Sequence, residues 1–110
     1  KDEHGARVEE SERILARIKP DEFVILLDER GKVFDSPALS NLIMRPIERS
    51  QTVVLIIGGA YGVDRPIFSS VDAVWSLSRL VFPHQLVRLI VTEQIYRAQE
   101  IAAGNPYHHR

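Results

Sequence analysis

Three short apolar runs in the sequence predict β-strands. Residues 23–27 and 52–57 are rich in Val, Ile and Leu and do not alternate with charged residues. Runs of this kind are typical of parallel sheets, in which both faces of a strand are buried. A third run, residues 73–78, is interrupted by serine and is also assigned to a strand. The polar stretch 29–32 is expected to be a loop.

Helical periodicity fills the segments around these runs. Residues 6–18 carry a thin apolar stripe that predicts an amphipathic helix, which a proline ends two residues later. Ser36, followed by proline, predicts the start of a second helix with Ser36 as its N-cap. We expect this helix to run to about Arg49 and to be disturbed near Pro46.

The longest periodic segment follows Pro83 and ends at Gly104, which is placed to supply a left-handed cap. Apolar residues cover more than half of its helix surface, which is more than an ordinary surface helix carries. The segment is therefore expected to be buried, either in the core or against a second subunit. A shorter helix is expected to open at Arg65.

This order of elements predicts an α/β fold. Alternating helices and strands indicate a mostly parallel sheet with helices on both faces. The 110 residues, of which 45% are apolar and 26% charged, are sufficient for one globular domain spanning 1–110.

Composition excludes several function classes. A formal net charge of −1 excludes a strongly basic nucleic-acid clamp, and the absence of Cys excludes thiolate metal sites and Cys nucleophiles. No apolar run reaches 18 residues and no signal peptide opens the chain, so we expect a cytoplasmic protein without a membrane span. Residues 79–110 are the only positive third, with four Arg and two Glu. From charge alone, contact of this third with a partner stays open.

Ligands of open α/β sheets bind beyond the carboxyl ends of the strands. Three segments meet this condition: 27–28, 58–62 and 78–83. The glycines of 58–62 allow close approach to a ligand, although a tight strand-to-helix connection needs the same residues. Their spacing fits neither a P-loop nor the dinucleotide fingerprint.

Other catalytic patterns are weak. No nucleophile elbow supports a hydrolase, and the histidine spacing does not support a metal site. His84 fits a helix-start residue better than a catalyst. Glu93 and Arg97 are four residues apart and predict a helix-surface pair. The alternative, an arginine that Glu93 orients toward a phosphate, stays open.

Four linked motifs resemble one family. They are LIIGGAYG at 55–62, SLSRLVFPHQLVR at 76–88, EQIYRA at 93–98 and NPYHH at 105–109. Together they resemble the RlmH family, the ribosomal RNA large-subunit methyltransferases H, which are small SPOUT methyltransferases. The match extends in order over residues 23–110.

The resemblance implies an S-adenosylmethionine-dependent enzyme that methylates N3 of a pseudouridine in 23S rRNA. It implies a homodimer that acts on assembled ribosomes and a SPOUT-type α/β knot with a C-terminal trefoil knot, an exception to the rule of unknotted chains. The cofactor-binding residues that it implies are Leu27, Gly58, Gly59, Leu77, Ser78, Arg79, Leu80, Val81, Phe82 and Pro83. No metal is implied.

The same resemblance implies that the C-terminal tail, residues 107–110, contributes to catalysis. N3 carries a proton, so a base is needed, and we expect His108, or second His109, to accept it. Tyr107 is expected to orient or stack the target base. Arg97, oriented by Glu93, and Arg88 are expected to hold phosphate or the cofactor carboxylate. The tail of one subunit is expected to complete the site of the other.

The sequence departs from the family pattern in two places. The family chain begins with a further strand and helix, so part of the RNA-facing surface is expected to be absent here, and Val81 replaces a threonine. Two alternatives follow: a SPOUT enzyme acting on another RNA such as tRNA, or a non-catalytic knotted dimer that binds the cofactor.

Overall fold

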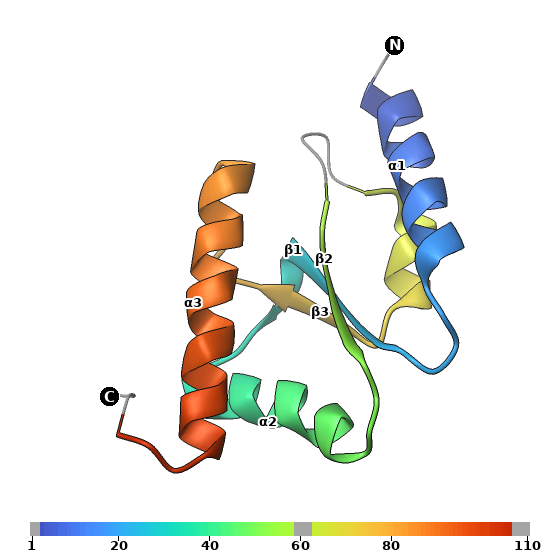
Figure 1. Ribbon diagram of the computed structural model, residues 1–110. Helices are drawn as coiled ribbons and strands as arrows, with labels where there is room; N and C mark the ends of the chain where they lie inside the picture. The colour runs from blue at the N-terminus through green and yellow to red at the C-terminus, as the bar shows by residue number, and fades with distance from the viewer. Residues whose placement is uncertain (1–2, 59–62, 107–110) are drawn as a thin grey trace.

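The computed structural model describes residues 3–58 and 63–106 (Figure 1). Its elements follow the predicted alternation of helices and strands. In chain order they are α1 (Glu3–Arg17), β1 (Phe23–Val33), α2 (Ser36–Glu48), β2 (Val53–Ile57), the 3-10 helix η1 (Arg65–Ser70), β3 (Ala73–Ser76) and α3 (His84–Ala102). The predicted α/β class is confirmed.

The three strands form one parallel sheet in the order β2-β1-β3. The central strand β1 pairs Phe23 with Val53 on one side and Ile25 with Ala73 on the other. Val24, Ile25 and Leu26 are at most 1% exposed. The prediction that the first apolar run is buried on both faces is therefore confirmed, and the physical reason is that both of its edges and both of its faces are covered.

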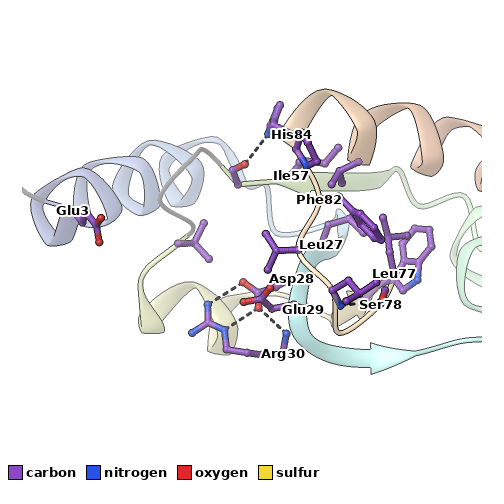
Figure 2. A pocket seen from close by; sticks show the side chains of 17 residues that line it. Glu3, Leu27, Asp28, Glu29, Arg30, Ile57, Leu77, Ser78, Phe82 and His84 are labelled. Atoms are coloured by element: carbon purple, nitrogen blue, oxygen red, sulfur yellow. Dashed lines mark hydrogen bonds and ion pairs between the residues drawn. The ribbon is translucent and has the colours of Figure 1, made fainter.

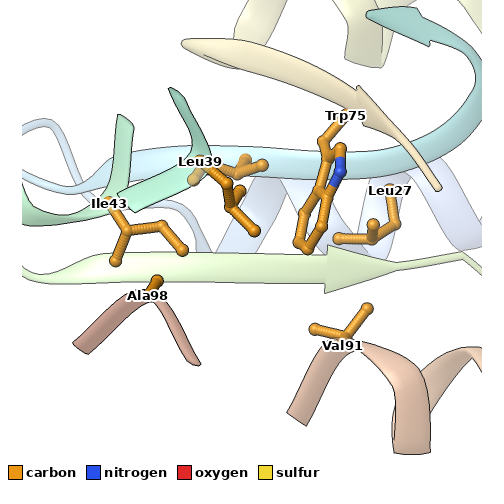
Figure 3. Packing of buried hydrophobic residues seen from close by; sticks show 7 residues of the cluster. Leu27, Leu39, Ile43, Trp75, Val91 and Ala98 are labelled. Atoms are coloured by element: carbon orange, nitrogen blue, oxygen red, sulfur yellow. The ribbon is translucent and has the colours of Figure 1, made fainter. Parts of the chain in front are cut away.

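Helices cover both faces of the sheet, as predicted. Ile25, Leu27 and Trp75 face α2 and α3, and they pack there against residues such as Leu39 and Val91 (Figure 3). Helix α1 and the 3-10 helix η1 lie on the opposite face (Figure 1), where side chains of β1 and β2 pack against them. This second cluster is centred on the residues Val24, Leu26, Ile56, Val63 and Ile67.

The prediction of a loop at residues 29–32 is wrong. β1 continues through this stretch to Val33 with a bulge, so that both Leu27 and Lys32 pair with Trp75 of β3. Gly31 makes this possible, since a Cβ atom there would lie 2.5 Å from the carbonyl oxygen of Val74. Pairing with β3 thus overrides the local preference of the polar residues for a turn.

Two further boundary predictions are corrected. The N-cap of α2 is Asp35, not Ser36, because the Asp35 carboxylate accepts a 2.9 Å hydrogen bond from the backbone N–H of Ala38. The third strand ends at Ser76 rather than residue 78. There the Ser76 hydroxyl donates to the carbonyl oxygen of Ser78 at 2.8 Å, and the chain leaves the sheet.

Pro46 does not end α2. It lies buried inside the last turn, and the helix continues to Glu48. The prediction for the end of α3 is confirmed, because Gly104 follows the helix with a φ of 77°, in the left-handed region.

The apolar surface of α3 is divided between two sides of the helix. Val91 and Ala98 are buried against the sheet and α2, whereas Leu89 is 67% exposed and Tyr96 51% exposed. Core packing therefore accounts for one side only. Among the described residues, no helix combines the length and apolarity needed to cross a membrane.

Candidate functional site

A cleft of about 620 Å³ lies at the carboxyl ends of the strands (Figure 2). Its walls come from the middle of β1, from the ends of β2 and β3 with the residues that follow them, from the first turn of α3, and from Glu3 and Val63. The lining residues are Glu3, Leu27, Asp28, Glu29, Arg30, Ile57, Gly58, Val63, Trp75, Leu77, Ser78, Leu80, Val81, Phe82, Pro83, His84 and Val87. Parallel strands bring these segments, which are far apart in the sequence, to one edge of the sheet.

Most of the residues predicted to bind a cofactor lie around this cleft. Eight of the ten line it: Leu27, Gly58, Leu77, Ser78, Leu80, Val81, Phe82 and Pro83. Arg79 is not among the lining residues, and Gly59 lies outside the described residues. The structure thus brings together residues of β1 and residues that follow β2 and β3.

The segment after β3 forms the most apolar wall. The backbone N–H of Leu80 donates to the Ser78 hydroxyl at 3.0 Å, which gives the segment a local turn. Leu80 is 69% exposed and Val81 79% exposed, so the turn presents apolar side chains at the cleft rather than in the core. Such a surface suits a ligand with a flat apolar ring.

His84 connects two walls of the cleft. Its Nδ1 lies 3.0 Å from the carbonyl oxygen of Gly58, across 26 residues of sequence (Figure 2). Because a carbonyl oxygen only accepts, Nδ1 carries the proton in this contact. His84 is the first residue of α3, as predicted, but the sequence contained no signal for its contact with Gly58.

Asp28 and Arg30 form an ion pair at the edge of the cleft that sequence reasoning missed (Figure 2). The Arg30 Nε and Nη2 atoms donate to the two carboxylate oxygens at 2.8 and 2.9 Å, and the Arg30 backbone N–H adds a third bond. The guanidinium also lies over the Phe68 ring, 4.4 Å from its centroid. Polar residues directly after a buried strand were the available signal.

The pKa of the Asp28 carboxyl reflects two opposing effects. Burial raises the pKa, but the hydrogen bonds and positive charge of Arg30 together lower it below the ordinary value. The pKa of Arg30 is raised in turn, mainly by its side-chain hydrogen bond to Asp28. Both groups are therefore charged at neutral pH.

The predicted catalytic residues are only partly described. Arg97 Nη2 donates to a carboxylate oxygen of Glu93 at 2.8 Å, which confirms the predicted pair on α3. Neither residue lines the cleft. Tyr107, His108 and His109 lie outside the described residues. Within the described ranges, no group of three or more His, Asp and Glu side chains has the arrangement needed to hold a metal ion.

Comparison with known proteins agrees with the resemblance in the sequence. A family model described as predicted SPOUT methyltransferase matches residues 1–108. A relative from Christiangramia forsetii, named ribosomal RNA large subunit methyltransferase H, is 41% identical over 110 residues, which cover 99% of this chain and 70% of the relative. Proteins of the same name from Desulfitobacterium hafniense and Gloeobacter violaceus are 46% and 41% identical and are covered over 68% and 70% of their lengths. The motifs match, the sheet is parallel and the similarity extends over nearly the whole chain. The protein therefore belongs to the SPOUT methyltransferase family.

Proposed function

We propose that this methyltransferase uses S-adenosylmethionine to methylate N3 of a pseudouridine in 23S ribosomal RNA on assembled ribosomes. The observation that carries the proposal is the cleft, because eight of the ten cofactor residues that the family resemblance implies line it. The names of the relatives support the RNA substrate class.

The cleft fits an adenosyl cofactor in size and chemistry. Its volume of about 620 Å³ lies within the usual range for cofactor sites. Leu77 and Phe82 offer apolar walls for an adenine ring, while Gly58 and Ser78 offer polar groups at the strand ends. When bound, the cofactor supplies a methyl group activated by a positively charged sulfur.

The residues of the chain have to orient the target base and remove a proton. Methyl transfer needs the attacking nitrogen in line with the methyl group, which positioning residues provide. We assign Tyr107 to the target base and His108 to the proton on N3, since a neutral imidazole accepts protons near pH 7. We assign Arg97 to a phosphate or the cofactor carboxylate, and its 2.8 Å bond to Glu93 holds it in one orientation.

We further propose a homodimer with the knot of the family at the C-terminal end of each chain. Support comes from the outer side of α3, where Leu86, Leu89 and Tyr96 are exposed. They lie at spacings of three and seven residues, and so on one side of the helix. In such a dimer the tail of one subunit completes the site of the other, in the cytoplasm where ribosomes are available.

Two variants test this assignment. His108→Ala should lower methylation of ribosomes at least a hundredfold, within the usual contribution of a general base, and leave the Kd for S-adenosylmethionine unchanged. Gly59→Val should abolish cofactor binding measured by calorimetry, because a side chain then fills the approach to the backbone.

Both readouts can contradict the proposal. Full turnover of His108→Ala would remove His108 as the base, and unchanged cofactor affinity of Gly59→Val would overturn the placement of the cofactor. Methylation of tRNA but not ribosomes, read by mass spectrometry, would establish the alternative substrate. Cofactor binding without transfer to either RNA would establish a non-catalytic dimer.

A further inference from the structure

A second groove lies away from the cofactor cleft, beside α2. Its volume is about 350 Å³, and its lining includes Phe23, Phe34, Asn41, Arg45 and Arg49. Every charged residue in its lining is an arginine. The cofactor cleft is different, because Glu3, Asp28 and Glu29 line it together with a single arginine.

The two arginines of this groove have no carboxylate partner among the described residues. Arg45 and Arg49 are four residues apart, on one side of α2 and its C-cap, and both are exposed. Like charges at this spacing repel each other. Three other helix arginines of the described chain, Arg7, Arg13 and Arg97, each form an ion pair with a glutamate three or four residues away.

Aromatic rings stand beside these charges. Phe23 is the first residue of β1 and Phe34 is the residue directly after its end. Both line the groove and are only partly buried. The Lys32 Nζ atom lies over the Phe34 ring, 5.4 Å from its centroid, which adds a third cation at this side. Unpaired cations beside accessible rings are the combination that single-stranded nucleic acids bind.

We propose that this groove binds a single-stranded segment of the ribosomal RNA substrate, with phosphates on Arg45 and Arg49 and a base against Phe34. The inference rests on the proposed function. A chain with a net charge of −1 attracts a polyanion only where its cations are not neutralised, and this groove is such a place. Phe23 of the groove and Leu27 of the cleft are four strand residues apart, on the order of 13 Å, which is within the reach of a short RNA segment.

A matched pair of double variants tests the groove. Arg45→Ala with Arg49→Ala removes the two groove cations, and Arg13→Ala with Arg17→Ala removes two exposed cations at the same spacing on α1. We expect the groove variant to weaken binding to purified assembled ribosomes roughly tenfold at physiological salt. The slope of log affinity against log salt should become shallower by about 1.4, which is two phosphate contacts at 0.7 each. The Kd for S-adenosylmethionine should not change in either variant.

Binding by sedimentation and methylation are measured separately, so that the two proposals fail in different ways. An unchanged salt slope in the groove variant, or an equal loss in the α1 variant, would overturn the groove as an RNA site. Wild-type protein that binds assembled ribosomes without methylating them would overturn the proposed function, while the groove would still be tested by its own variant. Wild-type protein that does not bind assembled ribosomes would overturn both proposals.

Discussion

At the residue scale, the edge of the cofactor cleft depends on a bulge that only glycine permits. Gly31 lies where β1 passes closest to β3, and a methyl group there would lie 2.5 Å from the Val74 carbonyl oxygen. The atom in the way belongs to the backbone of a paired strand, so it cannot move like the end of a flexible side chain. The bulge in turn carries Asp28 and Arg30 to the cleft.

Gly31→Ala should therefore destabilise the protein by about 1–3 kcal/mol, the usual cost of forcing extra volume into a packed site. Chemical denaturation measures the free energy of unfolding. Gly104→Ala is the control, because that position has a left-handed φ of 77° but nothing within 4 Å of the new Cβ. It should cost about 1 kcal/mol and leave cofactor affinity intact. If Gly31→Ala were as stable as wild type, β1 and β3 could move apart at this point without cost, and the close approach would not require glycine.

The Asp28–Arg30 pair makes stability depend on acid pH. The pKa of Asp28 is lowered in the folded state, so the unfolded chain binds a proton first as the pH falls. The stabilisation is fully present above the unfolded pKa of about 3.9 and is lost as the pH falls through the folded pKa. Asp28→Asn should thus lose less stability than wild type between pH 5 and pH 3 in urea titrations. Asp21→Asn, at an exposed turn residue, should follow wild type. Parallel curves for Asp28→Asn and wild type would contradict the role of the pair.

At the element scale, α3 serves two surfaces. Val91 and Ala98 face the core, and Ser40 of α2 donates a 2.8 Å hydrogen bond to the Ala98 carbonyl oxygen, which fixes the two helices against each other. Leu86 and Leu89 face outward. Burial of one leucine side chain contributes about 1.5–3 kcal/mol, so covering this outer side would stabilise the dimer that we propose.

Leu89→Lys should convert the proposed dimer to a monomer at micromolar concentration, because it places a charge in the apolar interface. Analytical ultracentrifugation measures the change. Val33→Lys is the control, since Val33 is 61% exposed but lies on β1. Methylation should fall with the dimer if the partner's tail completes the site, while cofactor binding persists. A Leu89→Lys variant that remains dimeric would place the interface elsewhere.

At the scale of the whole molecule, acidic and basic side chains nearly balance in number but gather on different surfaces. The net charge of −1 excludes a clamp that is basic throughout, and that exclusion stands. The structure adds that carboxylates gather at the cofactor cleft while unpaired arginines gather along α2. A near-neutral chain thereby has one surface suited to the proposed, positively charged methyl donor and another suited to the proposed RNA segment.

The sequence by itself determined the parts of the molecule that depend on neighbours in the chain. Unbroken apolar runs marked β1 and β2, and periodicity with Gly104 marked α3 and its end. The family resemblance also marked eight residues of the cleft, among them Gly58 directly after β2 and Leu77 directly after β3. These signals are local, so a linear pattern contains them.

Features that join residues far apart in the chain become visible in the folded molecule. The bulge in β1 arises because Gly31 meets Val74, and the contact between His84 and Gly58 spans 26 residues. The groove combines Phe23 with Arg49 because α2 folds back on the strand that precedes it. The physical reason is that closing each of these contacts costs chain entropy, so they form only when the whole sheet has paired and packed. A local sequence pattern therefore does not predict them.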